Sequence, residues 1–149
     1  MGKSETLKSI KAEWLKLRQT VESTPNYTRD LPGAEGLWSI TDCLKHVAGW
    51  DEEVIDVVCT FIESGAKRET GGAEEINDRL LEDRKHMDAS ETWGYFQTTH
   101  LSLISYLESL PEHVFDLASH TGHWIGYLVP QHYKDHREDI QTTIESITQ

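Results

Sequence analysis

Residues 129–140 read VPQHYKDHREDI, with His132 and His136 four residues apart. Residues at positions i and i+4 of an α-helix lie one above the other on the same face. Steps of three and four along this face give a mainly apolar stripe of Ile125, Val129, His132, His136, Ile140, Thr143 and Ile147. Such a stripe faces the core, so two polar rings are predicted where their nitrogens need partners. A histidine pair with this spacing can bind one transition metal, which needs at least one further ligand from another helix.

The composition indicates an ordinary globular chain, and we interpret residues 1–149 as one domain. The formal charge of −12 argues against nucleic acid or an anionic membrane as the partner, and we expect neither. No apolar run approaches membrane-spanning length, and the polar N-terminus has no secretory hydrophobic region. Cys43 and Cys59 are sixteen residues apart on one predicted helix, roughly 24 Å at the usual rise, so they cannot form a disulfide. These features favour a cytoplasmic protein.

Apolar residues at steps of three and four predict four long amphipathic helices. They span Ser4–Glu22, Ile40–Glu63, a stretch from the N-cap Ser90 to about Leu110, and Trp124–Ile147. Ser39 is predicted to cap the second helix by accepting a hydrogen bond from the N–H of Asp42. Pro130 predicts a kink or a late helix start near Val129. A short, charged helix at Ala73–Met87 is expected to cross the end of the fold.

The long connection between the second and third long helices predicts an all-α, antiparallel four-helix bundle with a crossover at that point. Bundles of this kind hold metal sites in the core, built from side chains on facing helices. His46 on the second helix can supply the third ligand if that helix runs parallel to the fourth, which would place the three rings at one height. His100 on the third helix is expected to be a hydrogen-bonded core or pocket residue rather than a fourth ligand.

Three neutral imidazoles leave at least one coordination position open, which is typical of catalytic rather than structural metal sites. A water or a thiol in that position would lose its proton near neutral pH. We expect Glu53, which follows His46 on one face of the second helix, to be the catalytic proton carrier or to hold a ligand in place. Asp42 is an alternative for orienting the ring of His46. Trp50, one turn after His46, is expected to line the substrate pocket.

Two segments resemble the signatures of the DinB superfamily. Leu37-Trp38-Ser39-Ile40 through His46-Val47-Ala48-Gly49-Trp50 is similar to its second-helix signature, and His132-x-x-x-His136 with Ile140 is similar to its fourth-helix signature. The resemblance implies a DinB-like bundle, often a homodimer, with a divalent metal held by His46, His132 and His136. Zinc is the default ion, and nickel, iron, cobalt or manganese also suit three histidines and water. The family includes transferases and isomerases that use low-molecular-weight thiols.

The resemblance leaves three functions open. The first is a metal-dependent enzyme that acts on a small-molecule substrate by hydrolysis or thiol transfer. The second is a metal-free binding or self-protection protein, since Trp124-Ile125-Gly126-Tyr127-Leu128 before His132 resembles the branch of the family that hydrolyses a reactive cyclopropane genotoxin. The third is a dimeric, stress-related protein whose site is vestigial. The first two differ in whether the three histidines bind a metal.

Overall fold

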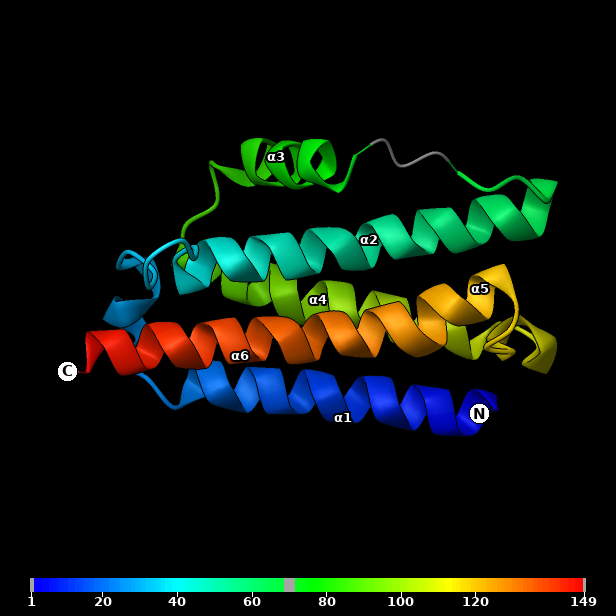
Figure 1. The fold of residues 1–149 in the computed structure, drawn as a ribbon, viewed down its shortest axis with the longest axis horizontal. Helices are drawn as coiled ribbons and strands as arrows, with labels where there is room; N and C mark the ends of the chain where they lie inside the picture. The colour runs from blue at the N-terminus through cyan, green and yellow to red at the C-terminus, as the bar shows by residue number, and fades with distance from the viewer. Residues whose placement is uncertain (1, 69–71, 149) are drawn as a thin grey trace.

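A computed structural model describes residues 2–68 and 72–148, and every regular element in these ranges is helical. The elements are α1 (Lys3–Glu22), η1 (Asn26–Asp30), α2 (Ile40–Ser64), α3 (Ala73–Arg84), α4 (Ala89–Glu108), η2 (Glu112–Phe115), α5 (His120–His123), η3 (Trp124–Leu128) and α6 (Val129–Ile147). The four long helices α1, α2, α4 and α6 form a bundle around one core (Figure 1). The predicted all-α four-helix bundle with a crossover between its second and third long helices is confirmed.

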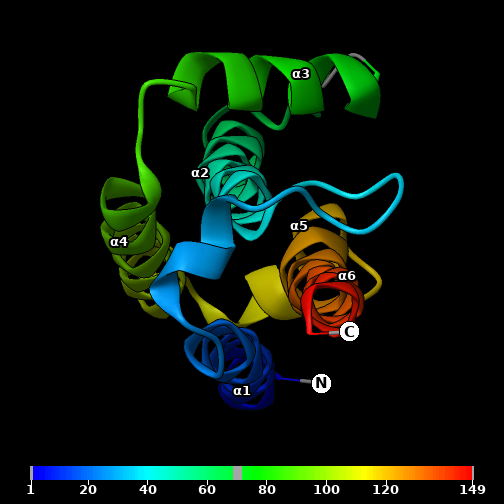
Figure 2. The ribbon, with the colours of Figure 1, turned by 90° about the vertical axis from the view of Figure 1, so that its left-hand side faces the viewer.

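The crossover decides the direction of each long helix. Viewed along the bundle, the four long helices occupy the corners of a square, with α2 between α4 and α6 (Figure 2). The segment that contains α3 returns the chain along the bundle, so α4 runs parallel to α2, and α6 runs antiparallel to α2 (Figure 1). The condition given for His46 as the third ligand, that its helix run parallel to that of the histidine pair, is therefore not met. Their histidines still meet, because α6 extends past the start of α2.

Both ends of α2 follow from local chemistry. The side chain of Ser39 accepts a hydrogen bond from the N–H of Asp42 at 3.1 Å, as predicted for an N-cap. Gly65 ends the helix in the left-handed conformation with φ of 72°, which glycine adopts without steric cost. The predicted start of the third long helix is wrong by two residues. Asp88, not Ser90, is the N-cap of α4, and its carboxylate accepts from the N–H of Glu91 at 2.8 Å.

Pro130 lies in the first turn of α6, which begins at Val129 as predicted. The five residues before α6 form a π-helix, η3, whose wider turn accommodates the missing N–H of Pro130. Gly126 lies inside this turn, and a Cβ there would be 2.5 Å from Cδ2 of Leu117. A larger residue here would have to displace the exposed side chain of Leu117 in the preceding loop, so glycine allows η3 to pack closely against that loop.

The short helix α3 crosses the outer face of α2 (Figure 2) rather than the end of the fold, and it ends at Arg84, before the predicted Met87. Its buried Leu80 lies against Gly49, where a Cβ would be 3.0 Å from Cδ2 of that leucine. Glycine therefore gives α2 a smooth surface on which α3 can lie. This placement puts the beginning of α3 beside Trp50 of α2, and its Ala73 and Asn77 line the same pocket as His46.

Candidate metal centre

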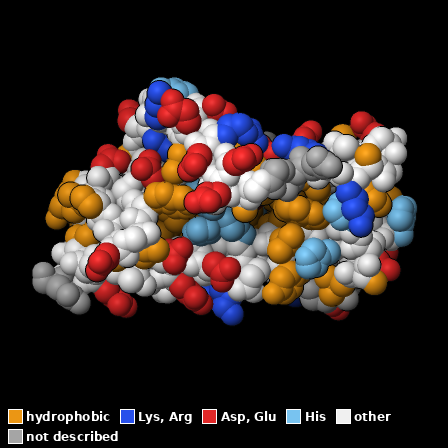
Figure 3. Space-filling model, turned by 45° about the horizontal axis from the view of Figure 1, so that its top comes forward, with side chains coloured by type: hydrophobic (Ala, Val, Ile, Leu, Met, Phe, Trp, Pro, Cys, Tyr) orange, Lys and Arg blue, Asp and Glu red, His pale blue; other side chains and the backbone are white. Residues whose placement is uncertain are grey.

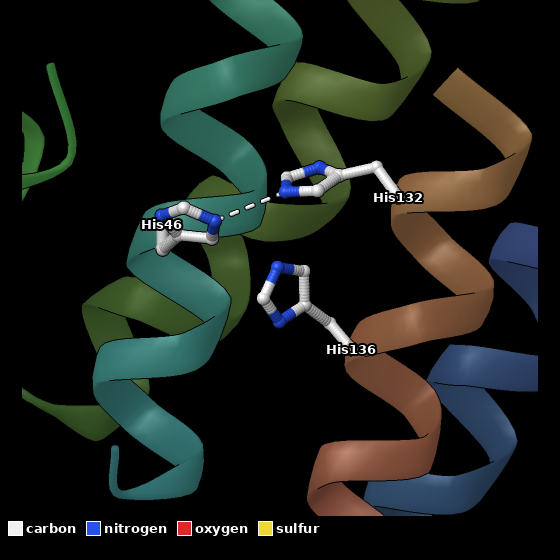
Figure 4. Close-up of side chains that lie close together, drawn as sticks. All are labelled: His46, His132 and His136. Carbon is white, nitrogen blue, oxygen red and sulfur yellow. Dashed lines mark hydrogen bonds between the residues drawn. The ribbon is translucent and has the colours of Figure 1, made fainter. Parts of the chain in front are cut away.

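Three histidines from two helices converge beside α2. Nε2 of His46 lies 3.0 Å from Nε2 of His132, and His136 follows one turn later on α6 (Figure 4). One ring nitrogen from each residue can be chosen so that all three lie within 4.8 Å of one another. In the described part of the chain, this is the one cluster of three or more potential metal-binding side chains. The structure thus brings together the three residues that were predicted as ligands from the sequence.

The three rings are held in their neutral form. Burial, together with the nearby His136, lowers the pKa of His46 to about 3. Burial also lowers the pKa of His132 well below its ordinary value, with both other histidines adding to the shift. Burial lowers the pKa of His136 too, although Asp139 and Asp135 oppose this. Neutral imidazoles offer a lone pair, which is the form of histidine that binds metals.

The ring of His136 is held in place by contacts to its Nδ1, on the side away from the other two histidines. Its Nδ1 lies 3.2 Å from Oδ2 of Asp139 and 3.6 Å from Sγ of Cys43, and its other nitrogen points toward the other two rings (Figure 4). A carboxylate that accepts the second N–H of a ligand histidine fixes its tautomer and raises its basicity. Burial raises the pKa of Cys43 far above its usual range, so this residue stays a neutral thiol. Asp42, the alternative orienting residue, instead pairs with Lys45 at 3.5 Å.

A pocket of about 430 Å³ opens onto the cluster. Its lining residues are His46, Trp50, Asp51, Val54, Ala73, Asn77, Trp124, Leu128, Val129, Gln131, His132, Asp135 and His136. Figure 3 shows histidine side chains in a hollow on this face, with hydrophobic and acidic side chains around them. The pocket therefore gives solvent and small molecules access to the three rings.

Trp50 lines this pocket and also ties α3 to α2. Its indole N–H donates to Oδ1 of Asn77 at 2.8 Å, so the beginning of α3 forms one wall of the pocket. The ring of Trp124 from η3 stacks against Trp50, with centroids 6.3 Å apart and an interplanar angle of 23°. Two indoles from distant segments thus form a continuous aromatic surface beside His132, whose ring centroid is 6.4 Å from that of Trp50.

A buried polar chain lies next to the cluster. The hydroxyl of Tyr133 donates to Oδ2 of Asp51 at 2.8 Å and lies 3.2 Å from Nδ1 of His100. Burial raises the pKa of Asp51 to about 8 and lowers that of His100 to about 4. Asp51 lines the pocket, whereas His100 is outside its lining and stacks on Trp14 at 4.1 Å. His100 is therefore a hydrogen-bonded core residue that reaches the pocket through Tyr133 and Asp51, and the pocket role predicted for it stays a prediction.

Glu53 lies away from the three histidines. Its carboxylate pairs with Arg79 of α3 at 2.7 Å and with Arg68 at 2.5 Å, and it does not line the pocket. Hydrogen bonds and charge from these two arginines lower its pKa despite the opposing effect of burial. Glu53 on α2 thus binds α3 through Arg79 and the segment after α2 through Arg68. The catalytic role predicted for it stays a prediction, and the carboxyls that line the pocket are those of Asp51 and Asp135.

Four of these residues were not among the site residues predicted from the sequence. Asp139 follows His136 by three residues, the spacing of helical neighbours, so it could have been found. Tyr133 lies on an equally regular stripe of Val129, Tyr133, His136 and Ile140, at steps of four, three and four. Asn77 and Trp124 could not have been found, because their place depends on how α3 and η3 pack on the bundle.

The donor set fits a divalent transition metal. Imidazole nitrogens suit zinc, nickel, iron, cobalt and copper, and around a tetrahedral ion with bonds of about 2.0–2.1 Å they lie roughly 3.3 Å apart. The observed separations of 3.0 Å and at most 4.8 Å bracket that value. Three neutral rings facing one another can satisfy few of their nitrogens by mutual hydrogen bonds. A cation bound by His46, His132 and His136 would satisfy one nitrogen of each.

Each helix in the described ranges lacks the length or the apolar character needed to cross a lipid bilayer. A family model described as the DinB superfamily matches residues 7–140, which includes all three histidines. Comparison with curated proteins finds no match.

Three solved structures share the fold. One is DfsB, described as a sibling lethal factor precursor, with a TM-score of 0.82, 15% identity, and coverage of 100% of this chain and 98% of that one. Another is the colibactin self-resistance protein ClbS in complex with double-stranded DNA, with a TM-score of 0.81, 13% identity, and coverage of 97% and 96%. A third, from Streptococcus pneumoniae, has a TM-score of 0.73, 15% identity, and coverage of 97% and 91%.

The DNA complex corrects one expectation. The charge of −12 suggested that nucleic acid is excluded as a partner. That exclusion is wrong, because a protein with the same bundle has been crystallised with double-stranded DNA. Net charge describes the average field of a protein, whereas DNA contacts are made by a local surface and by individual side chains.

Proposed function

This chain belongs to the DinB superfamily, and from its three-histidine cluster we propose that it is a divalent-metal-dependent enzyme acting on a small molecule. The observation that carries the proposal is the approach of His46 on α2 to His132 and His136 on α6, at the floor of a pocket of about 430 Å³. The reaction class is hydrolysis or thiol transfer, because both need an ionised water or thiol. When bound, the metal supplies Lewis acidity, which lowers the pKa of that water or thiol.

The surrounding residues have separate roles in this proposal. His46, His132 and His136 hold the ion, and Asp139 keeps the ring of His136 in the orientation that binding needs. Asp51 holds a proton near neutral pH, since burial raises its pKa to about 8, and it lies in the pocket with Tyr133 behind it. Asp51 can therefore give a proton to a leaving group. The indoles of Trp50 and Trp124 exclude water from one side of the pocket.

The test is elemental analysis of untagged protein, as purified and after reconstitution with zinc, nickel, iron, cobalt and manganese. The proposal expects about one equivalent of one of these metals, the stoichiometry of a single three-histidine site. Less than about a tenth of an equivalent of every metal after reconstitution would end it, because a site so weakly occupied cannot serve catalysis.

A second candidate, a metal-free self-protection protein, is favoured by the shared fold with the ClbS self-resistance protein. On this alternative the pocket itself holds a reactive compound, and His132→Ala leaves ligand affinity unchanged. Duplex DNA is to be tested as a partner in the same series, by anisotropy of a labelled duplex at low and moderate salt. Binding that weakens steeply with salt would indicate contacts to DNA phosphates.

A further inference from the structure

The pocket wall carries information about the substrate that the metal ligands do not. Among its lining residues, within the described ranges, the charged side chains are Asp51 and Asp135, and neither lysine nor arginine contributes. Arg68 and Arg79, on the same side of the fold as α3, are paired with Glu53. Arginine and lysine are the usual partners of carboxylate and phosphate groups. A substrate with an anionic group beyond its reacting atom would find no partner here.

Asp135 sets the charge of the open side of the pocket. It is exposed on α6, one residue before His136, and its Oδ1 accepts a hydrogen bond from Nε2 of Gln131 at 2.8 Å. The other carboxyl in the lining, Asp51, is buried and accepts a hydrogen bond from the hydroxyl of Tyr133, so Asp135 is the acidic group on the exposed side. Figure 3 shows acidic side chains on both sides of the histidine hollow.

The aromatic surface points to the same class of ligand. The N–H of Trp50 is already used by Asn77, so what Trp50 offers to the pocket is its carbon ring. Trp124, Leu128 and Val54 extend this surface. Indole rings bind flat, unsaturated groups by stacking and bind cations through their electron-rich faces.

We propose that the pocket selects flat, neutral or cationic small molecules and discriminates against anionic ones, with Asp135 and the Trp50–Trp124 pair as the specificity-determining residues. This inference rests on the proposed function, because the pocket leads to the proposed metal. It implies that a thiol substrate of this chain is one whose remaining groups are uncharged or positive.

The experiment uses cobalt-substituted protein and two rigid thiols of matched shape, 4-mercaptobenzoate and 4-(aminomethyl)benzenethiol. Their para substituents cannot fold back onto the metal, so they report on the wall of the pocket. Binding is followed by the sulfur-to-cobalt charge-transfer absorption. The cationic thiol should bind at least about tenfold more tightly than the anionic one, which is the effect of about 1.4 kcal/mol.

Two variants separate the wall from the metal. Asp135→Asn should reduce the preference for the cationic thiol severalfold, whereas Glu138→Gln, at an exposed acid on α6 outside the pocket lining, should leave it unchanged. Equal or tighter binding of 4-mercaptobenzoate to the wild type would overturn the inference while leaving the metal site intact. Failure of the protein to bind cobalt at all would overturn the proposed function and the inference with it.

Discussion

Nε2 of His46 lies 3.0 Å from Nε2 of His132, although 86 residues separate the two in the sequence. The two rings come from α2 and α6, which run antiparallel at adjacent corners of the bundle. His136 completes the group one turn later on α6, and all three can place a nitrogen within 4.8 Å. A bundle core would normally fill such positions with apolar side chains, so the arrangement indicates a binding site.

His132→Ala is expected to abolish metal binding, because it leaves two ligands on different helices and opens the site to water. Metal content measured by mass spectrometry should fall from about one equivalent to below about a tenth of one. His86→Ala is the matched control, since His86 is exposed near the end of α3. Unchanged metal content in His132→Ala would show that any bound metal lies elsewhere.

Asp139→Asn is expected to weaken metal binding without abolishing it. The carboxylate lies 3.2 Å from Nδ1 of His136 and is half exposed, so the amide should fit in its place. Loss of such a supporting group typically costs about 10- to 100-fold in metal affinity. Competition with a chromophoric chelator measures the change, and Glu138→Gln, one residue away on the exposed side of α6, serves as the control. Equal affinities in the two variants would remove the orienting role assigned to Asp139.

The long helices and the histidine cluster could be predicted from the sequence because both follow local rules. Steps of three and four marked all four long helices, and Ser39 marked the start of α2. His132 and His136 are neighbours on any helix, so their common face needed no tertiary information. The start of the third long helix was predicted at Ser90 instead of Asp88, because both residue types cap well and the sequence alone did not rank them.

The way the helices pack on one another could not be predicted from local sequence rules. The apolar stripe of α3 is short, with Ile76 and Leu80 buried, so the sequence did not indicate that it packs on Gly49 of α2. The chain of Asp51, Tyr133 and His100 draws one residue from each of three helices, and no spacing in the sequence relates them. Such contacts depend on the direction and rotation of each helix in the bundle.

Leu80→Ala is expected to lower the free energy of unfolding by about 2–5 kcal/mol, the usual cost of emptying a fully buried leucine site. Leu81→Ala, at the partly exposed neighbour, should cost less than about 1 kcal/mol. Urea unfolding followed by circular dichroism measures both. Similar costs for the two variants would mean that Leu80 does not anchor α3 to Gly49.

The buried carboxyl of Asp51 predicts a specific dependence of stability on pH. Burial raises its pKa from 3.8 to about 8, with Glu52 adding to the shift and the hydrogen bond from Tyr133 opposing it. Between these two pKa values the folded chain keeps a proton that the unfolded chain has released, so the stabilisation present below about pH 4 is lost as the pH rises toward 8. Asp51→Asn cannot ionise and should not show this loss.

The free energy of unfolding of wild type minus that of Asp51→Asn should therefore fall between about pH 5 and pH 8, by more than about 1.4 kcal/mol, the equivalent of one pKa unit. His46 and His100, whose pKa values burial lowers, destabilise the fold as the pH falls, and because both proteins contain them their effect cancels in the difference. The control is Glu138→Gln, at an exposed acid on α6 outside the pocket lining. A flat difference for Asp51→Asn would mean that this carboxyl is ionised in the folded chain at neutral pH, and the proton-donor role proposed for it would be lost.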